Sequence, residues 1–171
     1  MRDPSYELLT RGFTLRPMVA ADLPEVTQLV RSTEGLAFWD WETDQNLIRS
    51  LSRNPGLSQV ALDWKERRGK PEIVGCVIIG EGQMAMVHHL AVKPKARGKG
   101  NQIGTHLVRA GLKRLYKTPD AARRVYITTL RANLGAQMFW SKFGANKQAH
   151  GDLCVFTLNL LDAAHQNWLE S

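Results

Sequence analysis

The stretch of this sequence that most constrains its fold is Leu90–Val108, where an apolar strand, a basic glycine-rich turn and an amphipathic helix follow one another. The strand pattern ends at Val92-Lys93-Pro94, the turn spans Lys95–Gln102, and the helix pattern opens at Ile103-Gly104. This order points several backbone N–H groups, a helix N-terminus and cationic side chains at one place. A glycine-rich turn alone is a weak indicator, but one between a strand and a helix has the context that phosphate binding requires. The stretch therefore predicts a site for a phosphate or a pyrophosphate.

The strand and the turn resemble a motif of the GNAT superfamily of N-acetyltransferases. In that family a hydrophobic-Ala-Val-x-Pro strand leads into Arg/Gln-x-x-Gly-x-Gly/Ala at the start of a helix, and successive backbone amides hold the pyrophosphate of acetyl-coenzyme A. Counted from Pro94, Arg97 takes the arginine position of the motif. Counted back from Gly104, Lys99 takes it, with Gln102 where a glycine is usual. The loop is thus about two residues longer than the common form, and both registers stay open.

The resemblance covers roughly residues 13–161 and implies acetyl-coenzyme A as co-substrate. It places the pantetheine arm and the thioester carbonyl against the backbone amides of Leu90 and Val92. The residues that it implies for cofactor binding, at the strand end and in the loop, are Leu90, Ala91, Val92, Arg97, Gly98, Lys99, Gly100, Asn101, Gln102, Ile103, Gly104 and Thr105.

A second segment, Asn133–Gly144, follows the family pattern Asn-x-x-Ala-x-x-hydrophobic-Tyr-x-Lys-x-Gly. The resemblance makes Asn133 and Trp140 cofactor-binding residues as well. Trp140 stands at the tyrosine position, and its indole N–H is a donor that cannot serve as a practical acid for the leaving thiolate. Packing is the other interpretation for Trp140 and Phe139, and for Phe139 it is the preferred one.

The general base is the least certain element of the expected site. Many family members carry a glutamate four residues before the hydrophobic-Ala-Val triplet, and that position is Met86 here. His88 is the first candidate, because serotonin N-acetyltransferase of the same family has an aligned histidine and a neutral imidazole suits base catalysis near pH 7. Adjacent residues of a regular strand face opposite sides, which would put His89 on the other face and His88 on that of Leu90. Glu81, acting through a water, is the lesser candidate.

The periodicities predict a mixed α/β (α+β) domain in the order β-α-α-β-β-β-α-β-α-β. The expected strands are 13–16, 58–64, 73–80, 84–92, 125–130 and 153–160, and the expected helices begin near residues 22, 44, 103 and 134, with a short or frayed helix after 161. At 171 residues the chain is most simply one domain, 1–171. The order matches the GNAT fold, a central, mostly antiparallel sheet flanked by helices. The resemblance adds a splayed strand pair at the cofactor site.

The net charge of +7 is concentrated at the motif. Between Lys93 and Arg131 eleven Lys or Arg residues face one acid, Asp120, a balance of +10, while the rest of the chain carries −3. A small polyphosphate ligand explains this concentration as well as a nucleic acid would, and more locally. The aromatic and acidic run Phe38–Asp44 could receive a cationic amine or be an ordinary helix start.

The leading hypothesis is an acetyl-coenzyme A-dependent N-acetyltransferase that acts on a primary amine of a small molecule or a protein. A non-catalytic acyl-coenzyme A-binding protein of the same fold is the first alternative, and a nucleic-acid-binding module, which we do not favour, is the second. No apolar run is long enough to cross a membrane, and no His/Cys cluster has metal-ligand spacing. Buried free thiols at Cys76 and Cys154 would suit a cytoplasmic protein. The resemblance also implies that a homodimer can form.

Overall fold

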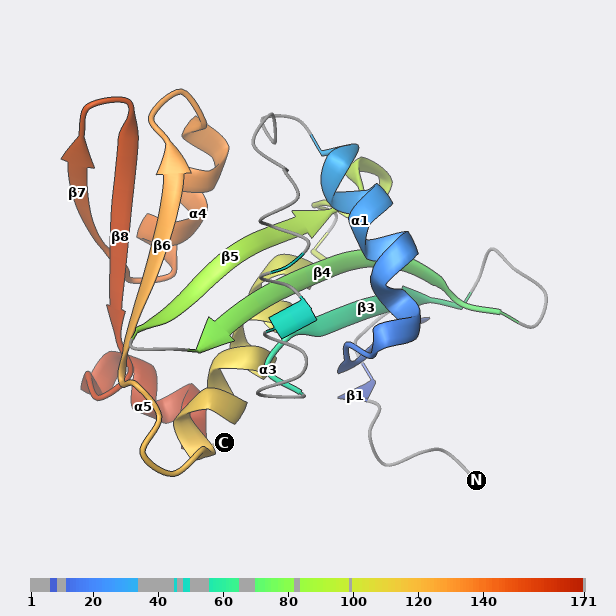
Figure 1. Ribbon diagram of the computed structural model, residues 1–171, viewed down its shortest axis with the longest axis horizontal. Coiled ribbons are helices and arrows are strands. Elements are labelled where there is room, and N and C mark those ends of the chain that lie inside the picture. The colour runs from blue at the N-terminus through green and yellow to red at the C-terminus, as the bar shows by residue number, and fades with distance from the viewer. Residues whose placement is uncertain are drawn as a thin grey trace.

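One mixed β-sheet forms the centre of the protein, and Figure 1 shows its strands from one edge of the sheet to the other. The structure, a computed structural model, describes residues 7–8, 12–33, 45, 48–49, 56–64, 70–81, 84–98 and 100–170. The sheet has the order β1-β2-β3-β4-β5-β6-β8-β7. Its strands are β1 (Glu7–Leu8), β2 (Phe13–Pro17), β3 (Gln59–Asp63), β4 (Glu72–Glu81), β5 (Ala85–Val92), β6 (Arg124–Leu130), β7 (Asn146–His150) and β8 (Leu153–Asn159). All neighbours are antiparallel except β5 and β6, so the predicted mixed, mostly antiparallel sheet is confirmed.

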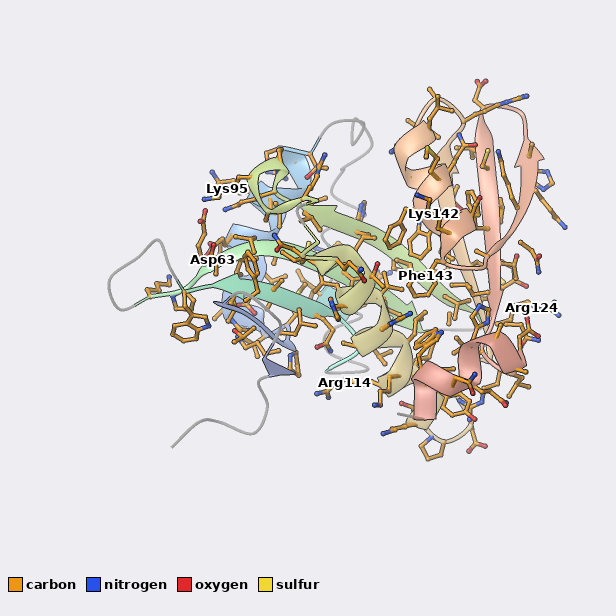
Figure 2. The ribbon with its side chains drawn as sticks, turned by 180° about the vertical axis from the view of Figure 1, so that it is seen from behind. Asp63, Lys95, Arg114, Arg124, Lys142 and Phe143 are labelled. Atoms are coloured by element: carbon orange, nitrogen blue, oxygen red, sulfur yellow. The ribbon has the colours of Figure 1, made fainter. Side chains whose placement is uncertain are left out.

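Helices cover both faces of the sheet. Helix α1 (Leu23–Arg31) packs on one face against β4 and β5, as Figure 1 shows in front of the sheet. Helices α3 (Ile103–Lys117), α4 (Leu134–Lys142) and α5 (Ala163–Glu170) lie on the other face, which Figure 2 shows from behind. Two 3₁₀ turns, η2 (Ala20–Asp22) and η3 (Pro94–Ala96), precede α1 and the loop before α3.

Two apolar clusters fill the space between the sheet and these helices. The cluster under α1, here the α1-side cluster, consists of Met18, Val26, Leu29, Val30, Val60, Leu62, Ile73, Cys76, Ile78 and Ala91. The larger α3-side cluster includes Val77, Ile79, Ala85, Val87, Leu107, Leu112, Val125, Phe156 and Leu158. Alternate residues of β4 enter opposite clusters, as expected of a sheet that is buried on both faces.

Neither edge strand of the sheet, β1 or β7, was predicted from the sequence. All five residues of β7 are exposed, so that strand has no alternation of buried and exposed positions to read. Its pairing with β8 is what makes it a strand. The tail after Leu161 is the helix α5, and the predicted helix from residue 44 to residue 52 lies mostly outside the described residues.

Candidate active site

The gap between β5 and β6 is the first feature of the candidate site. The two strands pair at Ala85↔Val125, Met86↔Tyr126 and Val87↔Ile127, and no later pair exists in the described part of the chain. Figure 1 shows the strands starting side by side and then diverging. The predicted splayed pair is therefore confirmed, and the gap opens beside the last five residues of β5.

The backbone of β5 turns hydrogen-bonding groups toward this gap. The N–H of Lys93 donates to the carbonyl of Val74 on β4, at 2.8 Å. Successive N–H groups of a strand point to opposite edges, so the N–H groups of Val92 and Leu90 point away from β4 and toward β6. These are the two amides that the sequence assigns to the pantetheine and the thioester carbonyl, and they face an edge without a ladder partner among the described residues.

The glycine loop after β5 adopts left-handed backbone at three positions. Gly98 has φ +68°, Gly100 has φ +72° and Gln102 has φ +48°. The N–H of Asn101 donates to the carbonyl of Gly98 at 3.0 Å, which closes a tight turn. Glycine supplies left-handed backbone without a steric cost, which explains two of the three residues at these positions.

Helix α3 begins at Ile103 with an open N-terminus. Gln102 is the N-cap, and its side chain makes no capping hydrogen bond in the described part of the chain. The first helical bond runs from the His106 N–H to the Gln102 carbonyl, at 3.0 Å. The N–H groups of Ile103, Gly104 and Thr105 precede that bond and are left for a ligand, which suits an anion.

The two extra residues of the loop are absorbed before this helix, which begins at Ile103. Arg97 is extended and Gly98 and Gly100 lie in turns, so none of them is helical; Lys99 lies outside the described residues. Asn101 is only 7% exposed and its Oδ1 has no partner among the described residues. Asn101 thus packs inward under the loop, while Gln102 makes the left-handed entry to the helix.

The charge of the basic stretch is less available than the sequence suggests. Glu72, at the start of β4, holds Lys93 at 2.5 Å and Lys95 at 2.9 Å; Lys95 is labelled in Figure 2. The hydrogen bond from Lys93, followed by that from Lys95, lowers the pKa of Glu72 to about 2. Arg109 lies over the Trp168 ring on α5, 5.5 Å from its centroid. The local excess of basic charge is therefore partly used within the protein.

Arg97 keeps a position at the gap. Its Nε donates to the carbonyl of Val92 at 2.7 Å, and the side chain is exposed. Because the carbonyl and the N–H of Val92 point to the same strand edge, the guanidinium lies where the gap meets the loop. Of the two candidate basic residues, Arg97 is the one that the described structure places there.

A β-bulge in β5 decides where the two histidines point. Ile78 pairs with His89, but the next residue of β4, Ile79, pairs with Val87, so His88 is the extra residue. The bulge shifts the alternation: Val87 lies in the α3-side cluster, and so does Leu90 rather than His89. His89 shares the α1 side with its partner Ile78, which belongs to the α1-side cluster.

The ring of His88 lies on this same side. A β-carbon built on Gly80 would be 2.4 Å from His88 Nε2, and Gly80 follows Ile79, which enters the α3-side cluster, so position 80 faces the α1 side. The predictions that His88 and His89 face opposite sides, and that His88 shares a face with Leu90, are therefore wrong. The physical reason is the bulge, which breaks the strict period of two.

Burial sets the titration of both imidazoles. Burial lowers the pKa of His88 below 6.5. Burial first, and then the charge of the adjacent His88, lowers the pKa of His89 to about 4. Both rings are therefore neutral at pH 7, which is the form that accepts a proton.

The downstream motif residues take two different positions. Asn133 is the N-cap of α4, where its Oδ1 accepts from the Ala136 N–H at 3.0 Å, and it is exposed. Trp140 is 3% exposed and packs edge-on against Phe139, with ring centroids 4.9 Å apart. This burial favours the packing interpretation for Trp140. Phe139 instead comes close to the first turn of α3, because a β-carbon on Gly104 would lie 3.5 Å from its ring.

Some of the candidate residues predicted from the sequence lie outside the described residues or have undescribed side chains. The backbone of Glu81 ends β4, but its side chain is not described, and Phe38–Asp44 lies wholly outside the described residues. The described residues contain no group of three or more His, Cys, Asp or Glu that could hold a metal ion. None of the described helices has the length and hydropathy of a membrane span.

The chain was compared with models of known protein families, and one family model matches it. The model described as Acetyltransferase (GNAT) family matches residues 21–145. No curated protein matches the chain at a significant level.

Several solved structures share the fold. Naa50 of Arabidopsis thaliana, in complex with the bisubstrate analogue CoA-Ac-MVNAL, is 16% identical with a TM-score of 0.67, over 86% of this chain and 99% of that chain. NAA60 of Arabidopsis thaliana with acetyl-CoA is 19% identical with a TM-score of 0.67, over 86% and 99%. PaiA N-acetyltransferase of Thermoplasma acidophilum with coenzyme A is 16% identical with a TM-score of 0.65, over 86% and 98%. At these identities the likeness establishes the fold.

Proposed function

Since the chain belongs to the GNAT acetyltransferase family, we propose that it transfers the acetyl group of acetyl-coenzyme A to a primary amine of a small molecule or a protein. The observation that carries this proposal is the meeting of two features at one end of β5. The gap between β5 and β6 can take an extended arm, and the open N-terminus of α3 can take a pyrophosphate.

The cofactor side of the proposal uses mainly backbone groups. The N–H groups of Ile103, Gly104 and Thr105 would hold the pyrophosphate, with Arg97 and Lys99 as its cationic neighbours. The N–H groups of Leu90 and Val92 would hold the pantetheine and polarise the thioester carbonyl. In the structures of related fold this cofactor is present by name, as acetyl-CoA in NAA60 and as coenzyme A in PaiA.

The reaction breaks the thioester C–S bond and forms an amide C–N bond. The ammonium group of the acceptor must lose one proton before it attacks, and the nitrogen loses a second as the amide forms; the thiolate takes up one proton, and one passes to solvent. We assign the first proton to His88, which is neutral at pH 7 and whose backbone is the first of β5 beyond the residues that pair with β6. Water protonates the thiolate, because the indole at Trp140 is not an acid.

The route from the amine to His88 runs through one water. The imidazole lies over Gly80 of β4, on the side of β5 away from the gap, so a water can bridge the amine and the ring. Glu81, which ends β4 one residue further on, keeps the secondary assignment through a water of its own.

The acceptor is a small amine or an exposed amino group of a protein. Related folds have been solved with a peptide-derived bisubstrate analogue, in Naa50, and with the Gag peptide and CoA, in the NatC complex. We therefore include peptides with a free N-terminus beside small amines. A location in the cytoplasm, a homodimer and a single domain over 1–171 belong to the same proposal; buried free thiols at Cys76 and Cys154 support the first of these.

The test is a turnover assay with acetyl-coenzyme A and a panel of amines, lysine peptides and peptides with free N-termini. Acetylated product found by mass spectrometry, with stoichiometric release of coenzyme A, is the expected result. Calorimetric binding of acetyl-coenzyme A without acetylation of any acceptor would instead identify a non-catalytic acyl-coenzyme A-binding protein. Failure to bind coenzyme A would overturn the proposal altogether.

A further inference from the structure

His88 can approach the backbone at position 80 closely because residue 80 is a glycine. A β-carbon there would meet His88 Nε2 at 2.4 Å and Cδ2 at 2.9 Å, both shorter than real β-carbon contacts. Gly80 is not among the glycines with left-handed backbone, so it is not there for conformational freedom. A glycine inside a strand instead marks a place where another group comes close to the backbone. That group is the imidazole of His88.

We infer that Gly80 is a positioning residue for His88, seating its imidazole against β4 and fixing which nitrogen faces the incoming amine. The inference rests on the proposed function, in which His88 removes the proton. Gly80 itself touches no reacting atom.

The contact fixes the orientation of the ring. The three heavy atoms nearest to the built β-carbon are Nε2, Cδ2 and, at 3.7 Å, Cε1. In a five-membered imidazole Nδ1 lies opposite the Nε2–Cδ2 bond, so Nδ1 is turned away from Gly80. We therefore assign the bridging water to Nδ1, the ring nitrogen that is turned away from Gly80.

The residues next to His88 help to hold its ring over Gly80. Met86 pairs with Gly80 across the ladder, so its side chain occupies the same row and face. His89 follows directly on the bulge and faces the same side. Met86 in the adjacent row and His89 next along the chain thus flank the His88 ring, which lies over Gly80, where no side chain stands in its way.

A side chain at position 80 would displace the ring by the space of a methyl group. Misplacement of a catalytic group by about 1 Å costs on the order of 10²-fold in rate. We expect Gly80→Ala to lower kcat by about 10- to 100-fold, with the KM for acetyl-coenzyme A unchanged, because the cofactor contacts lie on the other side of β5.

The decisive experiment is a double-mutant cycle of Gly80→Ala and His88→Gln, measured as kcat. If Gly80 acts through His88, adding Gly80→Ala to His88→Gln lowers kcat no further. Equal losses in both backgrounds would overturn the inference, and so would full activity of Gly80→Ala. Cys76→Ala is the matched control: it lies on the same strand and side, is buried, and should cost stability without this kcat loss.

Two further measurements separate this inference from the proposed function. The ring-nitrogen NMR signals of His88 should shift in Gly80→Ala whether or not His88 is the base. A fully active His88→Gln would therefore contradict the base assignment, while the position of the ring over Gly80 could still be tested by NMR. If Gly80→Ala fails to fold, His88→Ala added to it should restore folding by removing the clash. A double variant that stays unfolded, or unchanged ring signals in a folded Gly80→Ala, would refute the seat.

Discussion

The Nε of Arg97 donates a 2.7 Å hydrogen bond to the carbonyl of Val92, the last residue of β5. This bond ties the glycine loop to the strand edge that borders the gap. The other N–H groups of the Arg97 guanidinium are not used by this bond, and in the proposed function they bind a phosphate of the cofactor.

Replacing Arg97 and Lys99 together with Gln should raise the KM for acetyl-coenzyme A about tenfold or more, since a hydrogen bond to a charged group contributes about 1.5–3 kcal/mol. Steady-state kinetics at fixed ionic strength measures it. The control removes the same two charges from the far end of α3, as Lys113→Gln with Lys117→Gln, and should leave KM unchanged. Equal rises in both variants would show that overall charge, and not the loop, binds the cofactor.

Replacing His88 with Gln should lower kcat by about 10²–10⁴-fold, the usual contribution of a general base. In the unmodified enzyme activity should fall as the pH drops through the pKa of His88, which burial holds below 6.5. The pH–rate profile of the variant should lose that limb. Although His89 faces the same side, its pairing with Ile78 keeps it at the α1-side cluster, so His89→Gln should have the smaller effect on kcat. Full activity of His88→Gln across the pH range would move the base assignment to Glu81.

Replacing Glu72 with Gln should destabilise the protein at pH 7, because the ion pairs of Glu72 with Lys93 and Lys95 are removed. The folded-state pKa is lowered from 4.5 to about 2, so the stabilisation is fully present above pH 4.5 and is lost as the pH falls toward 2. Since both lysines are partly exposed, we expect about 1 kcal/mol at pH 7. Urea unfolding at pH 7 and at pH 3.5 measures the free energy of unfolding of both proteins. A difference that does not shrink at the lower pH would contradict the ion-pair assignment.

Two glycines of α3 should respond oppositely to the same substitution. A β-carbon at Gly111 would lie 2.5 Å from Ile79 Cδ1 and 2.6 Å from the Leu57 carbonyl oxygen, so Gly111→Ala should cost about 1–3 kcal/mol by overpacking. At Gly104 the nearest atom is 3.5 Å away, an ordinary contact, and Ala favours a helix over Gly by about 1 kcal/mol. Gly104→Ala should therefore be neutral or stabilising. Thermal unfolding of both variants decides it, and a stable Gly111→Ala would contradict the close approach of α3 to β4.

The sequence by itself determined the elements whose signal is local. The glycine loop, the start of α3 and the strand before it are adjacent in the chain, so their residue types and spacing predict both the structure and the phosphate site. The sequence leaves the register of the loop open between Arg97 and Lys99, and the structure shows Gln102 as the N-cap before Ile103. The splayed strand pair is predicted from the family resemblance that these residues carry.

Only the tertiary structure decided which groups in the site face one another. The bulge at His88 depends on how β5 pairs with β4, and it puts His88 and Leu90 on opposite faces, where a regular period of two would put them on the same face. The ion pairs of Lys93 and Lys95 depend on Glu72, which lies on the preceding strand and is distant in the sequence from the loop. Strand β7 and the contact between His88 and Gly80 likewise depend on a neighbouring strand of the sheet. The residue pattern of a single strand does not show in which register its neighbour pairs with it.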